Sequence, residues 1–169
     1  MTVLALTAAW LTGLGIPAQA PQLVVEPMQN PDWIAFTQGG VIHAPAGEVA
    51  AWGRGEGVET LLHELAHVAS YEAGERPVTP QEVAVEEGVA EAVADDLWIP
   101  WMRRFAPRGA QVASFSYDPQ VEWLRGLSAM GCRCDPDSRD ARRWRWRFVT
   151  GDRAAMTAEA MRVPVEGVE

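Results

Sequence analysis

Hydrophobic positions follow a helical period in several parts of the chain and form short continuous runs in others. Residues 2–14 are mostly apolar and are followed by Gly15 and Pro17, which predicts a first helix. From residue 58, apolar side chains recur at steps of three and four, as in a helix with one face in the core, and Gly74 favours its end. The residues of this stripe are Val58, Leu61, Leu62, Leu65, Val68 and Ala69.

A second helix has a clear beginning at Thr79. Pro80 suits its first turn, and Glu82 completes the Thr-x-x-Glu pattern of a capping box. Pro100 is expected to end or kink this helix, because proline lacks the N–H that the helix needs. Its apolar side consists of Val85, Val89, Ala92 and Val93.

A third helix is predicted to open at Asp118 and Pro119 and to stop at Gly131. Residues 143–148 alternate arginine with aromatic side chains, which predicts a strand, and the segments on both sides of it favour helices. The residues of the third helix expected to point inward are Val121, Leu124, Leu127 and Met130.

Three short runs before residue 58 are β-prone. Residues 22–26 suggest one strand, and residues 33–37 and 41–43 suggest a hairpin joined by residues 38–40. Residues 47–57 are rich in glycine and are predicted to form a loop. Together with the helices, these strands predict an α+β fold.

Length and charge limit the kinds of function. A chain of 169 residues with 48% hydrophobic residues is expected to form a single domain, residues 1–169. The net charge of −9 argues against a general nucleic-acid binder. The basic segment Arg142–Phe148 could clamp single-stranded nucleic acid, but pairing of its arginines with the chain's own acids is the favoured interpretation, and no nucleic-acid partner is expected.

Cys132 and Cys134 are the only cysteines, and one residue separates them. Two free thiols in a reducing compartment are expected, with a metal or redox site as the alternative. The apolar stretch at residues 2–16 is too short to span a membrane and lacks the basic residues of a secretory signal. The expected location is therefore the cytoplasm, or a virion if the protein is encoded by a phage.

The chemistry is concentrated in the motif formed by residues 63–67. His63 and His67 lie four residues apart, so a helix presents both imidazoles on one face, as a tetrahedral zinc ion requires. Glu64 is one step round the helix and can reach a metal-bound water without binding the metal. The competing interpretation is a surface helix whose histidines pair with nearby acids.

A zinc site of this kind needs a third protein ligand, and the second helix offers carboxylates. Glu87 and Glu91 share a face, while Glu86 is turned by about 100°. The helix facing favours Glu87, although Glu86 stays open as the alternative.

Residues 87–91, Glu-Gly-Val-Ala-Glu, resemble the Glu-Gly-x-Ala segment of gluzincins, a group of zinc peptidases. By this resemblance Glu87 is the zinc ligand and Glu91 holds His63, an arrangement that fits the need of a ligating imidazole for a carboxylate on its other nitrogen. In aminopeptidase-type gluzincins 18 residues typically separate the second histidine from the glutamate. Here 19 residues separate His67 from Glu87, so that spacing would point to Glu86.

The short chain and the hairpin before the motif are similar to the minigluzincins, which include the ImmA/IrrE-like proteins and phage-encoded metallopeptidases. This resemblance implies a small twisted sheet on the motif helix, a zinc core at about residues 33–96, and one Zn²⁺ per chain. It also implies hydrolysis of peptide or protein substrates with Glu64 as general base. The resemblance covers about residues 33–95; the helical patterns beyond it predict a mostly helical extension at about residues 97–169. Tyr71 and His43 are candidates for oxyanion or substrate contacts, and Tyr117 is a weaker one.

The alternative of a different class is a binding or structural protein on the same fold, such as a virion or regulatory component. In such a protein the metal would serve stability alone. The intact Glu64 favours the enzyme. The oligomeric state and the cleavage preference do not follow from the sequence.

Overall fold

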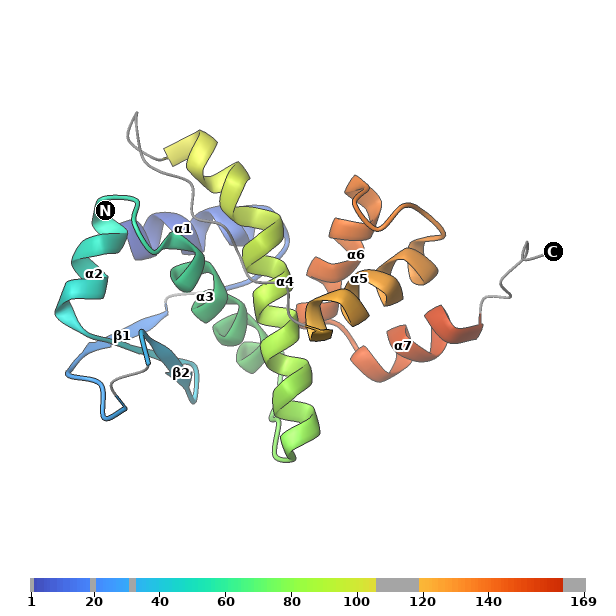
Figure 1. Cartoon of the computed structure of the whole chain (residues 1–169), viewed down its shortest axis with the longest axis horizontal. Coiled ribbons are helices and arrows are strands. Elements are labelled where there is room, and N and C mark those ends of the chain that lie inside the picture. Colours follow the sequence, from blue (N-terminus) through green and yellow to red (C-terminus); the bar gives the residue numbers. More distant parts are fainter. Residues whose placement is uncertain (1, 19–20, 31–32, 106–118, 163–169) are drawn as a thin grey trace.

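The long helix α4 lies between two groups of elements (Figure 1). The computed structural model describes residues 2–18, 21–30, 33–105 and 119–162, and within them seven helices and a three-stranded sheet confirm the α+β class. The sheet lies on the same side of α4 as α1, α2 and α3, and α5, α6 and α7 lie on the other side. The elements are α1 (Val3–Gly13), β1 (Gln22–Val25), β2 (Phe36–Gln38), β3 (Val41–Ala44), α2 (Ala46–Gly53), α3 (Val58–Glu72), α4 (Pro80–Phe105), α5 (Pro119–Cys132), α6 (Arg139–Thr150) and α7 (Arg153–Arg162).

The sheet has the order β1–β3–β2, with β1 parallel and β2 antiparallel to β3. The predicted hairpin is confirmed, but its loop is only Gly39-Gly40, because Gln38 pairs with Val41. Both glycines have a positive φ, 60° and 80°, which a tight turn with the twist of the strands requires. A Cβ on Gly40 would lie 2.8 Å from Cδ1 of Tyr71, so the turn packs directly on α3.

The helices predicted over residues 2–14 and from residue 58 are confirmed as α1 and α3, and the β-prone run at residues 22–26 is β1. α3 follows Gly57, whose φ of 62° suits glycine and whose Cβ position would lie 2.5 Å from Oε1 of Glu48. All six apolar residues of the predicted stripe are buried. One cluster of buried apolar side chains extends from α1 through α3 and α4 to α7.

The prediction of a loop over residues 47–57 is wrong, because Ala46–Gly53 form helix α2. Glu48 lies in its first turn, where the helix dipole favours an acid, and accepts a hydrogen bond from Nε1 of Trp52 at 2.8 Å. Trp52 is almost fully buried. Burial of this large side chain outweighs the helix-breaking tendency of the glycines around it.

The predicted capping box at the start of α4 is confirmed. Glu82 N donates to Oγ1 of Thr79 at 3.2 Å, and Oε2 of Glu82 accepts from Thr79 N at 2.9 Å. Pro100 does not end the helix, which continues beyond the proline to Phe105. Trp101 in that part is buried and donates from Nε1 to Oγ1 of Thr7 in α1 at 2.9 Å. Packing against α1 therefore outweighs the hydrogen bond that the proline removes.

The prediction of a strand over residues 143–148 is also wrong, because Arg139–Thr150 form helix α6. Ser138 caps this helix by accepting from Ala141 N at 3.2 Å. Over so short a run, a strict alternation of apolar residues fits a strand and a helix about equally well. Burial of one face against α4 and α5 favours the helix. The buried residues recur at helical steps: Ala141, Trp144, Arg145, Phe148 and Val149.

Arg145, at the centre of the basic segment, is 1% exposed and neutralised within the chain. Its Nε and Nη2 donate to the two carboxylate oxygens of Asp96 in α4, at 2.8 and 2.7 Å. Its Nη1 donates to Oγ of Ser128 and to the carbonyl of Pro136, both at 2.9 Å. This arginine thus ties α5 and α6 to α4.

Cys132 and Cys134 are joined by a disulfide bond, so the expectation of two free thiols is wrong. A single intervening residue allows this bond, because α5 ends at Cys132 and the chain turns there. The bond closes a loop of only three residues, and such a loop contributes about 1.5 kcal/mol in the chain-entropy model, below the about 2–4 kcal/mol of a typical structural disulfide.

Two further expectations concern α5. Val121, Leu124 and Leu127 are buried as predicted, whereas Met130 is 41% exposed. Asp118, predicted to open this helix, lies outside the described residues.

In the part of the chain that the structure describes, none of the helices has the length and apolar character that crossing a bilayer requires.

Replacing Asp96 by asparagine is expected to destabilise the fold by about 3–5 kcal/mol, because it leaves the buried guanidinium of Arg145 without its counter-charge. Urea denaturation followed by circular dichroism measures the change. Asp137→Asn is the matched control, since Asp137 is 71% exposed and pairs with Arg125 at the surface. The control should lose less than about 1 kcal/mol. Equal losses in the two variants would contradict a special role for the buried pair.

Candidate metal centre

The two histidines of the motif lie one turn apart on α3, on the side that faces α4. Nε2 of His63 lies 3.0 Å from Nε2 of His67, and the two rings meet edge to face, with centroids 4.7 Å apart. Their side chains are 19% and 13% exposed. The helical spacing of four residues therefore brings both imidazoles to one point, as predicted from the sequence.

α4 brings a carboxylate to the same point. Oε2 of Glu87 lies 3.2 Å from Nε2 of His63 and 3.5 Å from Nε2 of His67. Ligand atoms of these three residues all lie within 4.8 Å of one another, and the group could hold a metal ion. Glu86, the alternative ligand, contacts Nδ1 of His67 at 3.0 Å instead, on the far side of that ring.

Both imidazoles are also held at their other nitrogen. Nδ1 of His63 lies 3.0 Å from Oε2 of Glu91, the contact that the gluzincin resemblance implies. Nδ1 of His67 has the corresponding contact with Glu86. A carboxylate on Nδ1 fixes the ring and leaves Nε2 as the nitrogen that can bind a metal. Two histidines, oriented by Glu91 and Glu86, thus present their Nε2 atoms to the same point as a carboxylate oxygen of Glu87.

Arg153, the first residue of α7, supports this arrangement from outside. Its Nη1 donates to Oε2 of Glu86 at 2.5 Å, and its Nη2 donates to Oγ of Ser70 at 2.7 Å. The guanidinium is itself fixed by the carbonyls of Phe148 and Val149, at 2.9 and 3.3 Å. A chain of contacts therefore runs from α7 through Glu86 to His67. The sequence does not reveal it, because 67 residues separate Glu86 from Arg153.

Glu64 is buried beside the metal-binding group but does not belong to it. The hydroxyl of Thr37 in β2 donates to Oε2 of Glu64 at 2.8 Å and lies 3.2 Å from the carbonyl oxygen of the same residue. Burial raises the pKa of the Glu64 carboxyl, and the charges of His63 and His67 partly oppose this rise. Nothing in the sequence pattern singles out Thr37, whose position depends on the hairpin packing on α3.

A cavity of about 720 Å³ opens beside these groups. Its floor contains His63, Glu64, His67 and Glu87, and Tyr71 also lines it. The guanidinium of Arg76, which lines it too, stacks on the ring of Tyr71 at 3.4 Å from the centroid. Polar residues of β2, α3 and α4 and several apolar residues complete the lining. The apolar ones come from β2 and the residues before it, from the segment between α3 and α4, and from the first turn of α4: Trp33, Ala35, Phe36, Pro77, Val78 and Val83.

His43, another sequence candidate, is not brought to this cavity. Nδ1 of His43 lies 2.7 Å from Oε1 of Glu26, and its ring stacks on Phe36 with centroids 4.6 Å apart. His43 does not line the cavity. Tyr117 lies outside the described residues. Of the three candidates named for oxyanion or substrate contacts, only Tyr71 can therefore be assigned a position in this cavity.

The electrostatics of the metal-free group follow from burial and hydrogen bonds. Burial of the His63 ring opposes protonation, but hydrogen bonds to Glu87 and Glu91 outweigh it and raise its pKa to about 10. For His67 burial is again opposed by hydrogen bonds to Glu86 and Glu87, which raise its pKa to about 8. Hydrogen bonds to the same two histidines lower the pKa of Glu87.

Comparison of the chain with protein-family models, with curated proteins and with solved structures found no match. The function of the site is therefore inferred from its own residues and their geometry.

Binding of Zn²⁺ is expected to release about two protons per chain at pH 6.5, because a metal must displace the protons that His63 and His67 carry below their raised pKa values. The apparent association constant should then rise about hundredfold per pH unit below pH 8. Calorimetry in two buffers with different ionisation enthalpies counts the protons. His43→Gln, which changes a histidine outside the group, should leave the count unchanged. A count near zero would contradict this electrostatic description.

The same pKa values predict how the metal-free fold responds to pH. A histidine with a raised pKa stabilises the fold fully below its unfolded pKa of about 6.5. That contribution should be lost as the pH rises through about 8 and then about 10.

Arg153→Met is expected to weaken metal binding by about 10–100-fold, since it releases Glu86 and thereby the ring of His67. Competition with a chromophoric chelator measures the affinity, and the absorption spectrum of the Co²⁺-loaded protein should change as well. Arg153→Lys should recover part of the affinity. Arg143→Met, at an exposed arginine of α6, is the matched control and should bind as tightly as the wild type. An unchanged affinity in Arg153→Met would exclude this positioning role.

Proposed function

We propose that the protein is a zinc-dependent peptidase of the minigluzincin type. The proposal combines the resemblance of residues 63–67 and 87–91 to gluzincins with the geometry described above. His63, His67 and Glu87 would hold the ion, and Glu64 would act as general base. The sheet next to the motif helix agrees with the expected core of such an enzyme.

The observation that carries the proposal is the position of Glu64. It lines the same cavity as the metal-binding residues, is fixed by Thr37, and is not one of the ligands. A metal site that serves only stability has no use for a buried carboxylate that lines the same cavity without being a ligand. A general base, in contrast, needs this position and a raised pKa.

The donor set is suitable for zinc. Two imidazole nitrogens and one carboxylate oxygen make a three-residue set that leaves one position open, which is typical of catalytic zinc sites. A zinc ion bound there would polarise the attacking water and the carbonyl group of the substrate. The carboxylates of Glu91 and Glu86 keep Nε2 of each histidine directed toward that position.

The chain's own residues would carry the protons. Glu64 would accept a proton from the attacking water and pass it to the nitrogen of the leaving amine. Burial brings the pKa of this carboxyl closer to neutral pH, so the group can both accept and release a proton. The hydroxyl of Thr37 would keep the carboxylate in place during both transfers. Tyr71 lines the same cavity and is the candidate donor to the developing oxyanion.

The proposed substrate is an extended peptide segment. β2 lies at one edge of the sheet and lines the cavity through Phe36, Thr37 and Gln38, so a peptide could add to the sheet beside the metal-binding group. The apolar side chains of Trp33, Phe36, Pro77, Val78 and Val83 that line the cavity would accept an apolar side chain of the substrate.

Glu64→Gln tests the proposal most directly. The variant should keep its metal and its fold, because Glu64 is not a ligand, and should lose peptidase activity by at least about 10²–10⁴-fold, the usual contribution of a general base. Metal analysis, thermal unfolding and cleavage of a broad peptide library measured by mass spectrometry provide the readouts. Glu72→Gln, at an exposed glutamate of the same helix, is the matched control and should remain active.

His63→Ala should differ from Glu64→Gln in losing metal and stability together with activity. If the zinc-loaded wild type cleaves nothing in the library or among candidate protein partners, the peptidase proposal fails. A wild type that holds its metal but cleaves nothing would instead point to a binding or structural protein in which the metal stabilises the fold.

A further inference from the structure

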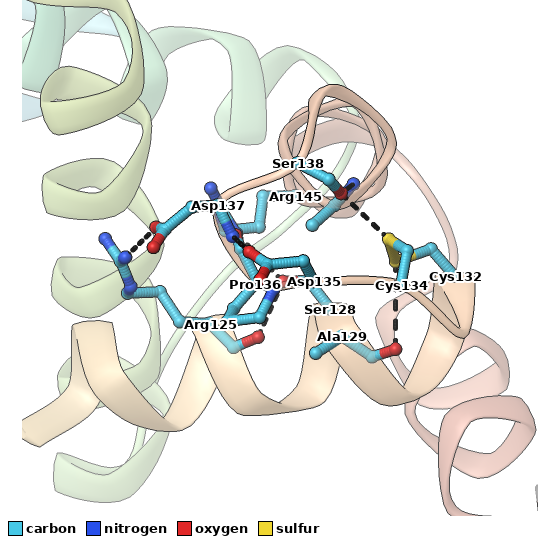
Figure 2. The surroundings of a disulfide bond; sticks show 11 residues. Arg125, Ser128, Ala129, Cys132, Cys134, Asp135, Pro136, Asp137, Ser138 and Arg145 are labelled. Carbon is cyan, nitrogen blue, oxygen red and sulfur yellow. Dashed lines mark hydrogen bonds and ion pairs between the residues drawn. A yellow bond between two sulfur atoms is a disulfide. The ribbon is translucent and has the colours of Figure 1, made fainter.

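The turn between α5 and α6 holds the two cysteines by means that do not depend on their bond (Figure 2). Cys134 N donates to the carbonyl of Ala129 at 3.2 Å, and Arg133 has a φ of 55°, in the left-handed region that commonly follows the end of a helix. These are features of helix capping. The turn can therefore keep the two sulfurs adjacent after the bond between them is broken.

This bond contributes little to the stability of the fold. It joins residues two positions apart, at the junction of two helices that are already held to α4 through Arg145 and Asp96. Breaking it would release little chain entropy, as the loop of three residues described above implies. Reduction should therefore leave the helices in place.

The sulfur of Cys134 has a hydrogen-bond donor. Oγ of Ser138 donates to Sγ of Cys134 at 3.0 Å and at the same time accepts from Ala141 N at 3.2 Å, which caps α6 (Figure 2). The sulfur is thus connected to the positive end of a 12-residue helix. Both the donated hydrogen bond and the helix dipole favour a thiolate at this position.

The sulfur of Cys132 has the opposite surroundings. Cys132 is the last residue of α5, at the negative end of that helix, and its Sγ lies 3.7 Å from the carbonyl oxygen of Ala129. A disulfide sulfur has no hydrogen to donate, so this contact becomes an S–H···O hydrogen bond only in the reduced protein. The carbonyl and the helix end both favour a protonated thiol at Cys132.

Several charged groups nearby are engaged in other contacts. Asp137 pairs with Arg125, and Asp135 accepts from Asp137 N at 2.8 Å. Arg145 is bound to Asp96. Arg133 is exposed and adjacent to both cysteines in the sequence, so it does not by itself distinguish them. The hydroxyl of Ser138 and the two helix ends are the features that do.

We propose that Cys132 and Cys134 form a thiol–disulfide exchange site that is reduced by a dithiol, with Cys134 as the sulfur released as thiolate. Both cysteines are partly exposed, so a reductant can reach them. This site is separate from the metal centre and does not depend on the proposed peptidase activity.

The exchange proceeds in two steps. A thiolate of the reductant attacks Sγ of Cys132 and forms a mixed disulfide, while the electron pair of the broken bond leaves with Cys134 as a thiolate that Ser138 stabilises. The second thiolate of the reductant then attacks the reductant's own sulfur in the mixed disulfide, and Cys132 leaves and takes up a proton. The reductant loses two electrons and two protons; Cys132 keeps one proton, and the other goes to solvent.

The experiment uses the full chain equilibrated with dithiothreitol in its reduced and oxidised forms at pH 7, followed by alkylation and mass spectrometry. The chain has only two cysteines, so every label can be assigned. Both cysteines should be reduced together under native conditions, and limiting iodoacetamide should label Cys134 at least about tenfold faster than Cys132, because a larger fraction of it is thiolate. A bond that resists excess dithiothreitol, or equal labelling rates, would overturn the proposal.

Variants at Ser138 test the origin of the difference. Ser138→Asp keeps a helix cap but has no hydroxyl to donate, so labelling of Cys134 should slow by at least about fivefold; Ser138→Thr keeps both and should behave like the wild type. Circular dichroism checks that α6 remains folded. If the Asp and Thr variants label Cys134 equally fast, Ser138 does not stabilise the thiolate and the proposal is wrong.

Discussion

Contacts between the carboxylates of α4 and the imidazoles of α3 are the constraint on which the rest of the structure depends. His63 and His67 each have one nitrogen facing the common point with Glu87 and the other nitrogen bound to Glu91 or Glu86. Two partly buried imidazoles and several carboxylates are costly to remove from water unless they are paired in this way. A rotation of α4 by one residue would exchange Glu86 and Glu87 and break both sets of contacts. The apolar packing of α4 against α3, which includes buried Leu65, Val89 and Val93, fixes that rotation.

The same helix organises the C-terminal part of the chain. Asp96 binds Arg145 of α6, and Glu86 binds Arg153 of α7, so acidic residues of α4 hold two helices of the C-terminal group, while Glu87 and Glu91 contact His63 of α3 on the other side. This explains the uneven charge along the sequence, where acids are concentrated before residue 97 and arginines between residues 139 and 153. The pairs Arg145–Asp96 and Arg153–Glu86 lie inside the chain. Arg145 is accordingly buried in the core and does not face a binding partner.

Elements with a long, regular hydrophobic period were predictable from the sequence, and so was the geometry that depends on them. α3 and α4 follow from the spacing of their apolar residues, and the facing of Glu87 and Glu91 follows from the helical period. The positions of Thr37 and Arg153 were not predictable, because each depends on how distant elements pack. α2 was missed because its single buried Trp52 gives no period, and α6 was mistaken for a strand because Trp144, Trp146 and Phe148 alternate over too short a run.

The contact of Arg153 with Glu86 has a consequence for the time at which the site is completed during synthesis. A ribosome produces the motif helix and α4 well before it reaches α7, and 67 residues separate the two partners of this contact. The N-terminal residues can begin to make contacts while later residues are still being added. While α7 is still inside the ribosome, His67 and Glu86 can meet, but the guanidinium that fixes Glu86 is absent. The histidines would then hold a metal ion less tightly in the nascent chain than after α7 has emerged, which delays full assembly of the centre until α7 has been made.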